Sequence, residues 1–365
     1  MIKFGYSAPI IIWWPLAYNG TNDGEWIAGQ SITQNSIDGR GGDDVLFGNI
    51  GYDHLSGDSG NDSLYGREGN DMLFGGDGRD WLQGDEGNDW LWGDDGDDTL
   101  LGGDGDDQIW GGNGNDRLDG GHGQDQLFGD AGDDQIFLGD GACTADGGDG
   151  DDYIAGSHGA YTVNGGNGND EIHANGVLDN INGGAGDDRI FGGDGLDEIS
   201  GDAGNDVIYA GGGNDYVHFG EGYDIVYCGT GDDTANFNLM QINSPFYVNG
   251  EAGYDTISMD YVGGLASKFD FQLSWISQRA DSIERLDFNN LIPKIDFYLK
   301  PADILDFTDA GDLKIDGNGN HTLHLDGGWQ DNGIAKGTNY HDFTAADGNQ
   351  LVHLHVDTAV HVEMA

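Results

Sequence analysis

Positive charge is scarce in this sequence. Its 365 residues include 13 Lys and Arg against 67 Asp and Glu, which gives a formal net charge of −54. Binding to nucleic acid needs a basic surface, so a nucleic-acid partner is excluded. Chains this acidic are often disordered. The 15 Tyr, 15 Phe and 9 Trp residues and a periodic aliphatic pattern favour instead a chain that folds once its acids are neutralised.

Long apolar runs are also missing. The best candidate, residues 8–17, is too short to span a bilayer, so we expect no transmembrane insertion. It is a poor secretory signal, because only Lys3 precedes it and two prolines interrupt it. We expect this segment to cap the first coil of the fold. Insertion into a membrane or partner, or a cleaved signal, are the alternatives.

What the sequence does contain is a nine-residue repeat. From residue 39 to residue 236 the pattern Gly-Gly-x-Gly-x-Asp-x-Leu/Ile-x runs through 22 units without an insertion or a deletion. Residues 75–83 and 102–110 are clean copies. A repeat held in register over this length predicts a solenoid, in which each turn stacks on the one before.

The last three positions of each unit, x-Leu/Ile-x, predict a very short strand. Side chains alternate faces along a strand, so the aliphatic residue points inward and its neighbours outward. The six residues before it form the predicted turn, because glycine allows backbone angles closed to other residues and leaves carbonyls bare. The inward series is Leu46, Leu55, Leu64, Leu73, Leu82, Leu91, Leu100, Ile109, Leu118, Leu127, Ile136, Ile154, Ile172, Ile181, Ile190, Ile199, Ile208, Val217 and Val226.

The Asp that closes each turn supplies a hard carboxylate oxygen. Calcium takes six to eight oxygen ligands, more than one loop offers, so two stacked loops are expected to share each ion. The predicted side-chain ligands are Asp44, Asp53, Asp62, Asp71, Asp80, Asp89, Asp98, Asp107, Asp116, Asp125, Asp134, Asp152, Asp170, Asp188, Asp197, Asp206, Asp215, Asp224, Asp233 and Asp255. Predicted backbone-carbonyl ligands include Gly75, Gly76, Asp77, Gly78, Gly93, Asp95, Gly102, Gly103, Asp104 and Gly105.

These units resemble the RTX (repeats-in-toxin, haemolysin-type) calcium-binding repeats over well over half of the chain. The resemblance implies an all-β, right-handed parallel β-roll with two nonads per turn and calcium along both edges. It implies that each ion takes backbone carbonyls and the Asp from one loop, and the same from the loop eighteen residues later.

Calcium would change the charge of the chain greatly. About 16 structural ions, a number estimated from loop pairing, would bring roughly +32 and lower the net charge to about −22. Extracellular calcium modules bind at about 0.1–1 mM, far above free calcium inside a cell. We therefore expect a chain that is unfolded inside the cell and folded outside.

Cysteine is nearly absent. Cys143 and Cys228 fall in units five full turns apart, which at about 4.8 Å per strand separates them by about 24 Å. A disulfide needs Cα atoms within about 7 Å. We predict two free thiols.

Three units lack the ligand signature. They are the twelfth, fourteenth and sixteenth, so in a roll with two nonads per turn they share one edge. Cys143 and Tyr161 replace the ligand Asp, and Val177 replaces a turn glycine. We expect an unbroken calcium ladder on one edge and a gap on the other, arising either by drift or as a partner-binding patch. The three units are residues 138–146, 156–164 and 174–182.

Aromatic residues recur every eighteen positions at the outward end of strands and predict a ladder on one outer face. Such residues suit exposed strand positions, so the ladder serves the stability of the sheet or, as an apolar patch, marks an interaction site. Sugar rings of cell-surface glycans or a second copy of the protein are the candidate partners. The candidate partner-binding residues are Phe74, Trp90, Trp92, Trp110, Phe128 and Tyr161.

The nonad register fails after residue 236. A 13-residue insertion precedes a last copy of the repeat, which is therefore out of phase. Beyond it we predict strands at residues 268–273, 313–315, 322–325 and 351–356. The predicted domains are an N-terminal cap at 1–38, the β-roll at 39–258 (insertion 237–249, last nonad 250–258) and a β-rich C-terminal cap at 259–365.

The C-terminal region also carries a resemblance. Segments such as 281–287 and 302–306 resemble the part that closes many large RTX adhesins. This resemblance implies an uncleaved signal for type I export in the cap.

No catalytic motif stands out. HExxH and GxSxG are absent, and Gly57-Asp58-Ser59-Gly60, which imitates a serine-protease motif, falls in phase with a calcium turn. RTX enzymes carry catalytic domains upstream of their repeats, and 38 residues are too few for one. We expect no enzyme.

The sequence thus predicts a secreted, calcium-folded β-roll with a structural or adhesive role at a cell surface, in a matrix or in a surface layer, with self-assembly as an option. The alternative is a calcium-dependent carbohydrate-binding module that uses the aromatic face.

Overall fold

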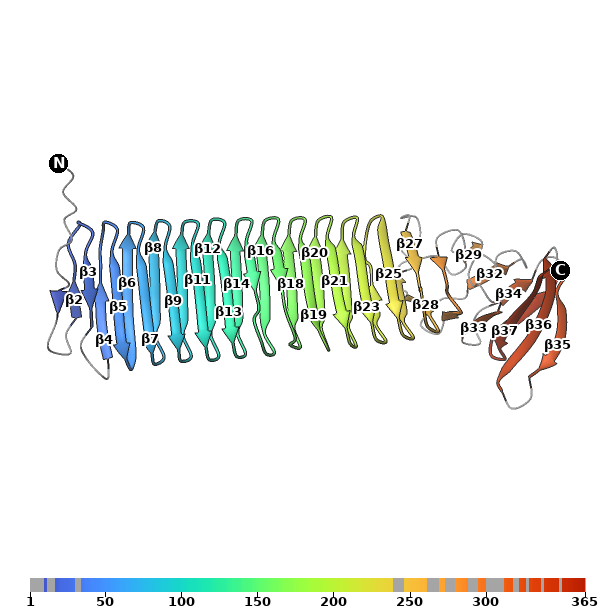
Figure 1. The fold of residues 1–365 in the computed structure, drawn as a ribbon. Helices are drawn as coiled ribbons and strands as arrows, with labels where there is room; N and C mark the ends of the chain where they lie inside the picture. The colour runs from blue at the N-terminus through green and yellow to red at the C-terminus, as the bar shows by residue number, and fades with distance from the viewer. Residues whose placement is uncertain are drawn as a thin grey trace. The chain divides into compact units, whose positions relative to one another are not determined.

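The chain folds into β-strands throughout the part that the computed structural model describes (Figure 1). It divides into two compact units, Met1–Arg189 and Ile190–Ala365. Within the described residues there is no helix, and hence none long and apolar enough to cross a membrane. The described residues are 10–11, 17–29, 34–238, 246–260, 269–272, 280–287, 295–299, 312–317, 322–325, 328–335, 338–347 and 350–364.

Two parallel sheets build the first unit, and neighbouring repeat strands in each sheet are eighteen residues apart. Consecutive strands therefore alternate between the sheets, and two nonads make one turn, which confirms the predicted parallel β-roll. One sheet contains β1 (Ile10–Ile11), β3 (Trp26–Ala28), β5 (Val45–Ile50), β7 (Ser63–Glu68), β9 (Trp81–Glu86), β11 (Thr99–Asp104), β13 (Arg117–His122), β15 (Gln135–Phe137), β17 (Tyr153–Ala155) and β19 (Glu171–Gly176). The other contains β2 (Ala17–Asn19), β4 (Gln34–Asp38), β6 (Tyr52–Ser59), β8 (Met72–Asp77), β10 (Trp90–Asp95), β12 (Gln108–Asn113), β14 (Gln126–Ala131), β16 (Thr144–Asp149), β18 (Thr162–Asn167) and β20 (Asn180–Ala185).

The core of the roll is the inward aliphatic series. Every predicted member, from Leu46 to Val226, is no more than 1% exposed. Ala145 and Val163 take the same place in two of the irregular units. The residues on either side of each inward position are partly or fully exposed, as the alternation of faces along a strand requires.

The prediction of three-residue strands was wrong for most turns. Strand β8 has six residues, because pairing continues past the aliphatic position into the first three positions of the next nonad. Asp94 of β10 pairs with Gly76 of β8. Gly76 has a φ of 108°, a backbone angle that glycine adopts without strain. The turn proper is therefore positions four to six of each nonad.

The second unit contains further parallel strands of the same kind and a smaller four-stranded sheet. Strand β21 (Arg189–Asp194) spans the division between the units. One parallel series is β23 (Val207–Gly212), β25 (Asp224–Thr230), β27 (Phe246–Asn249) and β30 (Ala280–Asp281). The other runs through β22 (Glu198–Ala203), β24 (Tyr216–His218), β26 (Thr234–Asn238), β28 (Thr256–Asp260), β31 (Arg285–Asp287), β33 (Asp312–Asp316) and β37 (Gln350–Asp357).

An antiparallel hairpin and a separate sheet complete the second unit. Strand β36 (Tyr340–Asp347) pairs antiparallel with both β35 (Gln330–Ile334) and β37. The separate sheet contains β29 (Phe269–Gln272), β32 (Ile295–Leu299), β34 (Thr322–Leu325) and β38 (His361–Met364). The four strands predicted after residue 259 correspond to β29, β33, β34 and β37, although residues 268 and 273 lie outside the described part.

The last nonad is out of phase in sequence but in register in space. Thr256 pairs with Thr234, twenty-two residues earlier, and the amide of Asp233 donates to Asp255 Oδ1 at 3.0 Å. The extra residues thus do not displace the stack. Both cysteines are buried and free, as predicted.

Candidate metal centres

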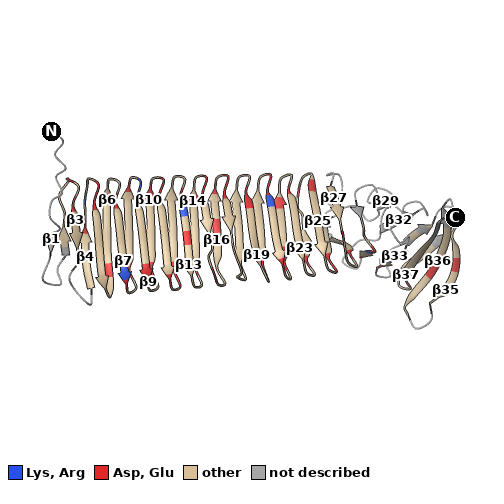
Figure 2. Cartoon of the chain, in the orientation of Figure 1, with Lys and Arg blue, Asp and Glu red and all other residues tan. Residues whose placement is uncertain are grey.

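Aspartates at position six of the nonads close the turns on both edges of the roll. Figure 2 shows acidic residues at the loops that join the strands. All twenty predicted side-chain ligands are described, and each is at most 3% exposed. Position seven of each nonad, the first residue of the strand, directly follows the aspartate. The pairing of the strand in the sheet therefore fixes where the carboxylate points. Burial of so many carboxylates needs compensating partners.

One oxygen of each carboxylate ties two turns together. The amide of Asp62 donates to Asp80 Oδ1, and the amide of Asp80 donates to Asp98 Oδ1, both at 2.7 Å. On the other edge the amide of Asp71 donates to Asp89 Oδ1 at 2.7 Å. The same bond repeats every eighteen residues along each edge, so Oδ1 is satisfied by the protein itself.

The second oxygen has no such partner in most turns. A carboxylate oxygen buried without a hydrogen bond is costly, because it has lost its water. Burial raises the pKa of Asp80 to about 7 and those of Asp89 and Asp134 to about 8. Buried Oδ2 atoms without a hydrogen-bond partner occur in Asp44, Asp62, Asp71, Asp80, Asp89, Asp98, Asp107, Asp116, Asp134, Asp152, Asp170, Asp215, Asp233 and Asp255.

Glycine at position one leaves space beside this oxygen. A Cβ added to Gly57 would overlap Asp62 Oδ2 and would lie 2.7 Å from the carbonyl oxygen of Gly75 in the next turn. A carboxylate oxygen and a carbonyl oxygen therefore face the same space. Such a set of hard oxygens fits calcium. The donor atoms of these turns are therefore of the kind that binds calcium.

The ten predicted carbonyl ligands do not all share one environment. Those of position one (Gly75, Gly93, Gly102) face the glycine of the preceding turn, and those of position three (Asp77, Asp95, Asp104) accept an amide from a position-four glycine, such as Gly60 to Asp77 at 2.8 Å. The carbonyls of Gly78, Gly103 and Gly105 lie against the following turn. For the carbonyl of Gly76, the structure gives no comparable contact among the described residues.

No group of three or more His, Cys, Asp or Glu side chains able to hold a metal occurs in the described ranges. His355 of β37 places its Nδ1 2.6 Å from Asp342 Oδ1.

Sequence reasoning missed the acids and amides that close the ends of the ladders. The amide of Glu25 donates to Asp44 Oδ1 at 2.6 Å, and Asn35 donates to Asp53. At the other end Asp255 donates its amide to Glu284 at 3.0 Å. The buried Ile27 and Ile37, which precede Leu46 and Leu55 by about one turn, were the available signal.

The aromatic ladder forms as predicted, with rings stacked face to face. Ring centroids are 4.5 Å apart for Phe74 and Trp92, 5.0 Å for Trp92 and Trp110, and 5.5 Å for Trp110 and Phe128. Both faces of the two inner rings are covered by neighbours. Trp90, 41% exposed, meets Trp92 edge-on.

Further stacks were missed. Phe47 stacks on Tyr65 at 5.0 Å in the first unit, and Tyr209 stacks on Tyr227 at 5.1 Å in the second. The sequence signal for these stacks was an aromatic residue at position nine of nonads that lie eighteen residues apart. Tyr161 differs from these residues, because it is 1% exposed and points inward rather than toward a partner.

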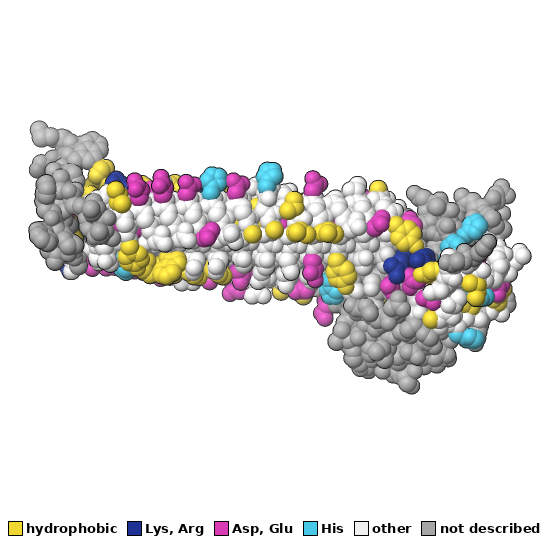
Figure 3. Space-filling view, turned by 90° about the horizontal axis from the view of Figure 1, so that it is seen from below, with side chains coloured by type: hydrophobic (Ala, Val, Ile, Leu, Met, Phe, Trp, Pro, Cys, Tyr) yellow, Lys and Arg dark blue, Asp and Glu magenta, His cyan; other side chains and the backbone are white. Residues whose placement is uncertain are grey.

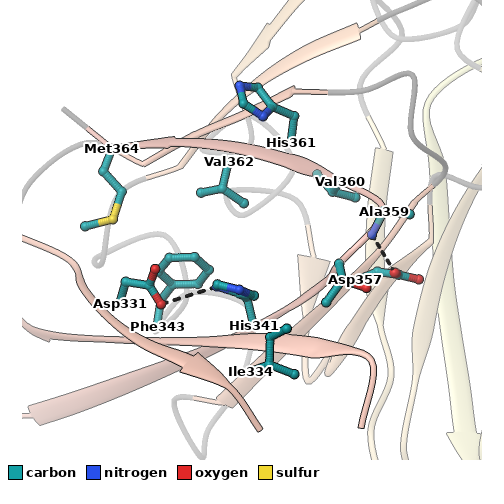
Figure 4. A pocket seen from close by; sticks show the side chains of 11 residues that line it. Asp331, Ile334, His341, Phe343, Asp357, Ala359, Val360, His361, Val362 and Met364 are labelled. Carbon is teal, nitrogen blue, oxygen red and sulfur yellow. Dashed lines mark hydrogen bonds and ion pairs between the residues drawn. The ribbon is translucent and has the colours of Figure 1, made fainter.

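Two further surface features carry acidic and histidine side chains. Figure 3 shows a row of acidic and histidine side chains along one border of the face in view. Glu68, Glu86 and Asp104 line an open groove beside β7, β9 and β11. In the second unit, a pocket beside β36 and β38 holds His341, whose Nδ1 lies 3.3 Å from Asp331 Oδ1 (Figure 4).

Stacked parallel coils whose buried carboxylates face carbonyl oxygens define a calcium-binding β-roll. Comparison with protein families agrees: the model of the RTX calcium-binding nonapeptide repeat matches residues 38–142 and 144–226, more than half of the chain. The chain therefore belongs to the RTX calcium-binding nonapeptide repeat family. A comparison with curated proteins gives no match.

Proposed function

We propose that the chain is exported unfolded and folds on calcium outside the cell, where it serves a structural or adhesive role. The observation that carries this proposal is the column of buried Oδ2 atoms without hydrogen-bond partners on each edge. At neutral pH these oxygens need a cation, and free calcium reaches the required range outside cells. The twenty predicted aspartates supply the side-chain ligands, for about 16 ions in all.

The role is proposed as non-catalytic. Nearly every turn presents the same acid in the same place, bonded to its neighbour in the same way, as in Asp98 and Asp116. Such uniformity suits a load-bearing or surface-covering element. It gives no single acid the distinct environment that general acid and base catalysis needs.

The aromatic face supports stability more than glycan binding. Sugar rings stack on an exposed aromatic ring face. Both ring faces of Trp92 and Trp110, however, are covered by the neighbouring rings of the stack. The carbohydrate-binding alternative therefore rests on Trp90 and the outer edges of the ladder. Self-assembly through this face is the other use that we propose.

Calorimetric calcium titration with analytical sedimentation tests the proposal. We expect calcium to drive folding at about 0.1–1 mM, with magnesium unable to replace it. Asp80→Asn should weaken binding, because it removes the charge of a buried carboxylate. Asp77→Asn is the matched control, since Asp77 is exposed in the same nonad. Equal affinity of both variants and the parent would contradict the ligand assignment.

Sedimentation of the calcium-loaded chain tests its role. Concentration-dependent species larger than the monomer support assembly. A monomer that binds soluble glycans, and loses them in Trp90→Ala with folding intact, would instead favour the carbohydrate-binding module.

A further inference from the structure

One edge of the roll carries a stretch in which the buried side chains at position six are hydrogen-bonded to other groups of the protein. Its position-six residues, in successive turns, are Asp125, Cys143, Tyr161 and Asp179. All four are buried. None of them has a buried side-chain oxygen without a partner, in contrast to Asp134, Asp152 and Asp170 on the opposite edge of the same turns.

The hydroxyl of Tyr161 closes one loop. Its oxygen lies 3.0 and 3.1 Å from the amide nitrogens of Ser157 and His158. It lies 2.8 Å from the amide nitrogen of Gly159 and donates to the carbonyl oxygen of Gly139 at 2.9 Å. Both capacities of a phenol, donor and acceptor, are thus used inside the loop.

The ring of Tyr161 also fills the space beside position one. A Cβ at Gly156 would overlap the ring carbon Cε2 of Tyr161, whereas the equivalent Cβ at Gly57 would overlap Asp62 Oδ2. Carbon therefore stands where other turns have a carboxylate oxygen. This loop does not fit a calcium ion.

Asp179 is committed to hydrogen bonds. Its Oδ1 accepts the amide of Tyr161 at 2.8 Å, and its Oδ2 accepts the amide of Gly176 at 2.9 Å. The turn backbone differs too, because Val177 does not take the positive φ that Gly105, at 139°, has in the same position of its nonad. No carboxylate oxygen is left over for a cation.

Cys143 completes the stretch. Its Sγ accepts the amide of Asp125 at 3.4 Å and lies 3.8 Å from Asp125 Oδ2 and 3.5 Å from the carbonyl oxygen of Gly123. The neighbouring position-five residues, Ala142, Ala160 and Leu178, carry no charge.

We propose that residues 139–179 of this edge form a metal-independent clasp, in which protein hydrogen bonds replace calcium and from which the calcium-dependent coils propagate. The inference rests on the calcium-driven folding proposed above. In a solenoid, each coil contacts only its neighbours, so folding starts wherever a coil is stable and spreads outward. A coil whose turn on one edge is held by protein hydrogen bonds needs calcium only on its other edge, so fewer carboxylate charges have to be neutralised before it folds.

Hydrogen exchange of the full-length chain during a calcium titration tests the clasp. We expect loops 139–143, 157–161 and 175–179 to become protected at calcium concentrations at least about threefold below those that protect repeats 84–107. Simultaneous protection of both regions would overturn the clasp. Unchanged protection throughout the chain in chelator would overturn the clasp and the proposed function together.

Variants sharpen this test. Tyr161→Phe leaves amides of the loop without their acceptor, so protection of residues 157–159 should require about tenfold more calcium. The number of bound ions should stay the same. Tyr153→Phe is the control, since Tyr153 is 37% exposed, and should change neither quantity. Loss of bound ions in Tyr161→Phe would contradict the clasp while leaving calcium-driven folding intact.

Discussion

The two edges of the roll solve the same problem in different ways between residues 125 and 179. On one edge Asp134, Asp152 and Asp170 each leave a buried oxygen without a hydrogen-bond partner. On the other edge, the side-chain oxygens of Tyr161 and Asp179 all have partners, which are backbone amides for both residues and also a carbonyl for Tyr161. The comparison indicates that each turn needs partners for its buried position-six side chain, which we propose are a cation on one edge and protein groups on the other.

The largest expected difference is at position four, where the calcium turns have glycine and the last turn of the clasp has Val177. Gly105 has a φ of 139°, and a Cβ there would overlap the carbonyl oxygen of Gly87. Gly105→Ala should therefore cost about 3 kcal/mol in the calcium-loaded protein, measured by chemical denaturation. The control is Val177→Ala in the clasp, where the residue has a Cβ already and the cost should be about 1 kcal/mol or less. Equal losses would show that the two turns have the same backbone requirement.

The same substitution on the two edges should have different consequences. Asp152→Asn should lower the number of bound calcium ions, because the Asp152 side chain keeps one oxygen for a cation. Asp179→Asn should leave the ion count unchanged and lower the stability by about 1–2 kcal/mol through a lost hydrogen bond. Native mass spectrometry counts the ions. A reduced count in Asp179→Asn would erase the difference between the edges.

Acid should stabilise the metal-free roll. Burial raises the pKa of Asp80 from 3.8 to about 7 and that of Asp134 from 3.8 to about 8 in the folded chain. Below about pH 4 these carboxyl groups are protonated in both the folded and the unfolded chain, so they do not lower the free energy of unfolding. As the pH rises toward about 8, the unfolded chain releases these protons more readily than the folded chain does, and the free energy of unfolding falls.

Thermal unfolding in calcium-free buffer measures this effect. The calcium-free Tm should fall as the pH rises from 5 toward 7, and most of the unfolding transition should be lost by pH 8. With saturating calcium the order should reverse, since protons compete for the ligand oxygens. A calcium-free Tm that rises with pH would contradict the assignment of the raised pKa values to these turns.

The aromatic ladder should affect stability alone and leave calcium binding unchanged. Trp92→Ala removes two stacking contacts and should cost about 1–3 kcal/mol, with no change in the number of calcium ions. Trp90→Ala should cost less, because Trp90 is 41% exposed and contacts Trp92 edge-on, outside the face-to-face stack. A larger loss in Trp90→Ala would show that the stack is not what stabilises this face.

The sequence could predict the features of the fold that depend only on the nine-residue period of the repeat. Leu46 and its successors follow from one aliphatic residue every nine positions, and the free thiols follow from the spacing of Cys143 and Cys228. Strand length could not be predicted this way, because β8 extends only through pairing with strands eighteen residues away. The stacking of Asp255 on Asp233 depends on how an inserted loop is absorbed, which the period does not describe.

The candidate site shows the same limit. The repeated Asp signals a ligand, but it does not show that Oδ1 is used by the protein and Oδ2 is left over. Nor does the sequence reveal that Tyr161 turns inward, since its hydroxyl is held by amides within its own loop. Both results depend on backbone geometry in the turn.

Far-UV circular dichroism of the full-length chain in excess chelator is the most direct test of the account. We predict that chelation at neutral pH removes most of the β-signal outside the clasp, and that calcium, not magnesium, restores it. A complete β-signal without any divalent cation would mean that the buried carboxylates are satisfied in another way, and would contradict the account.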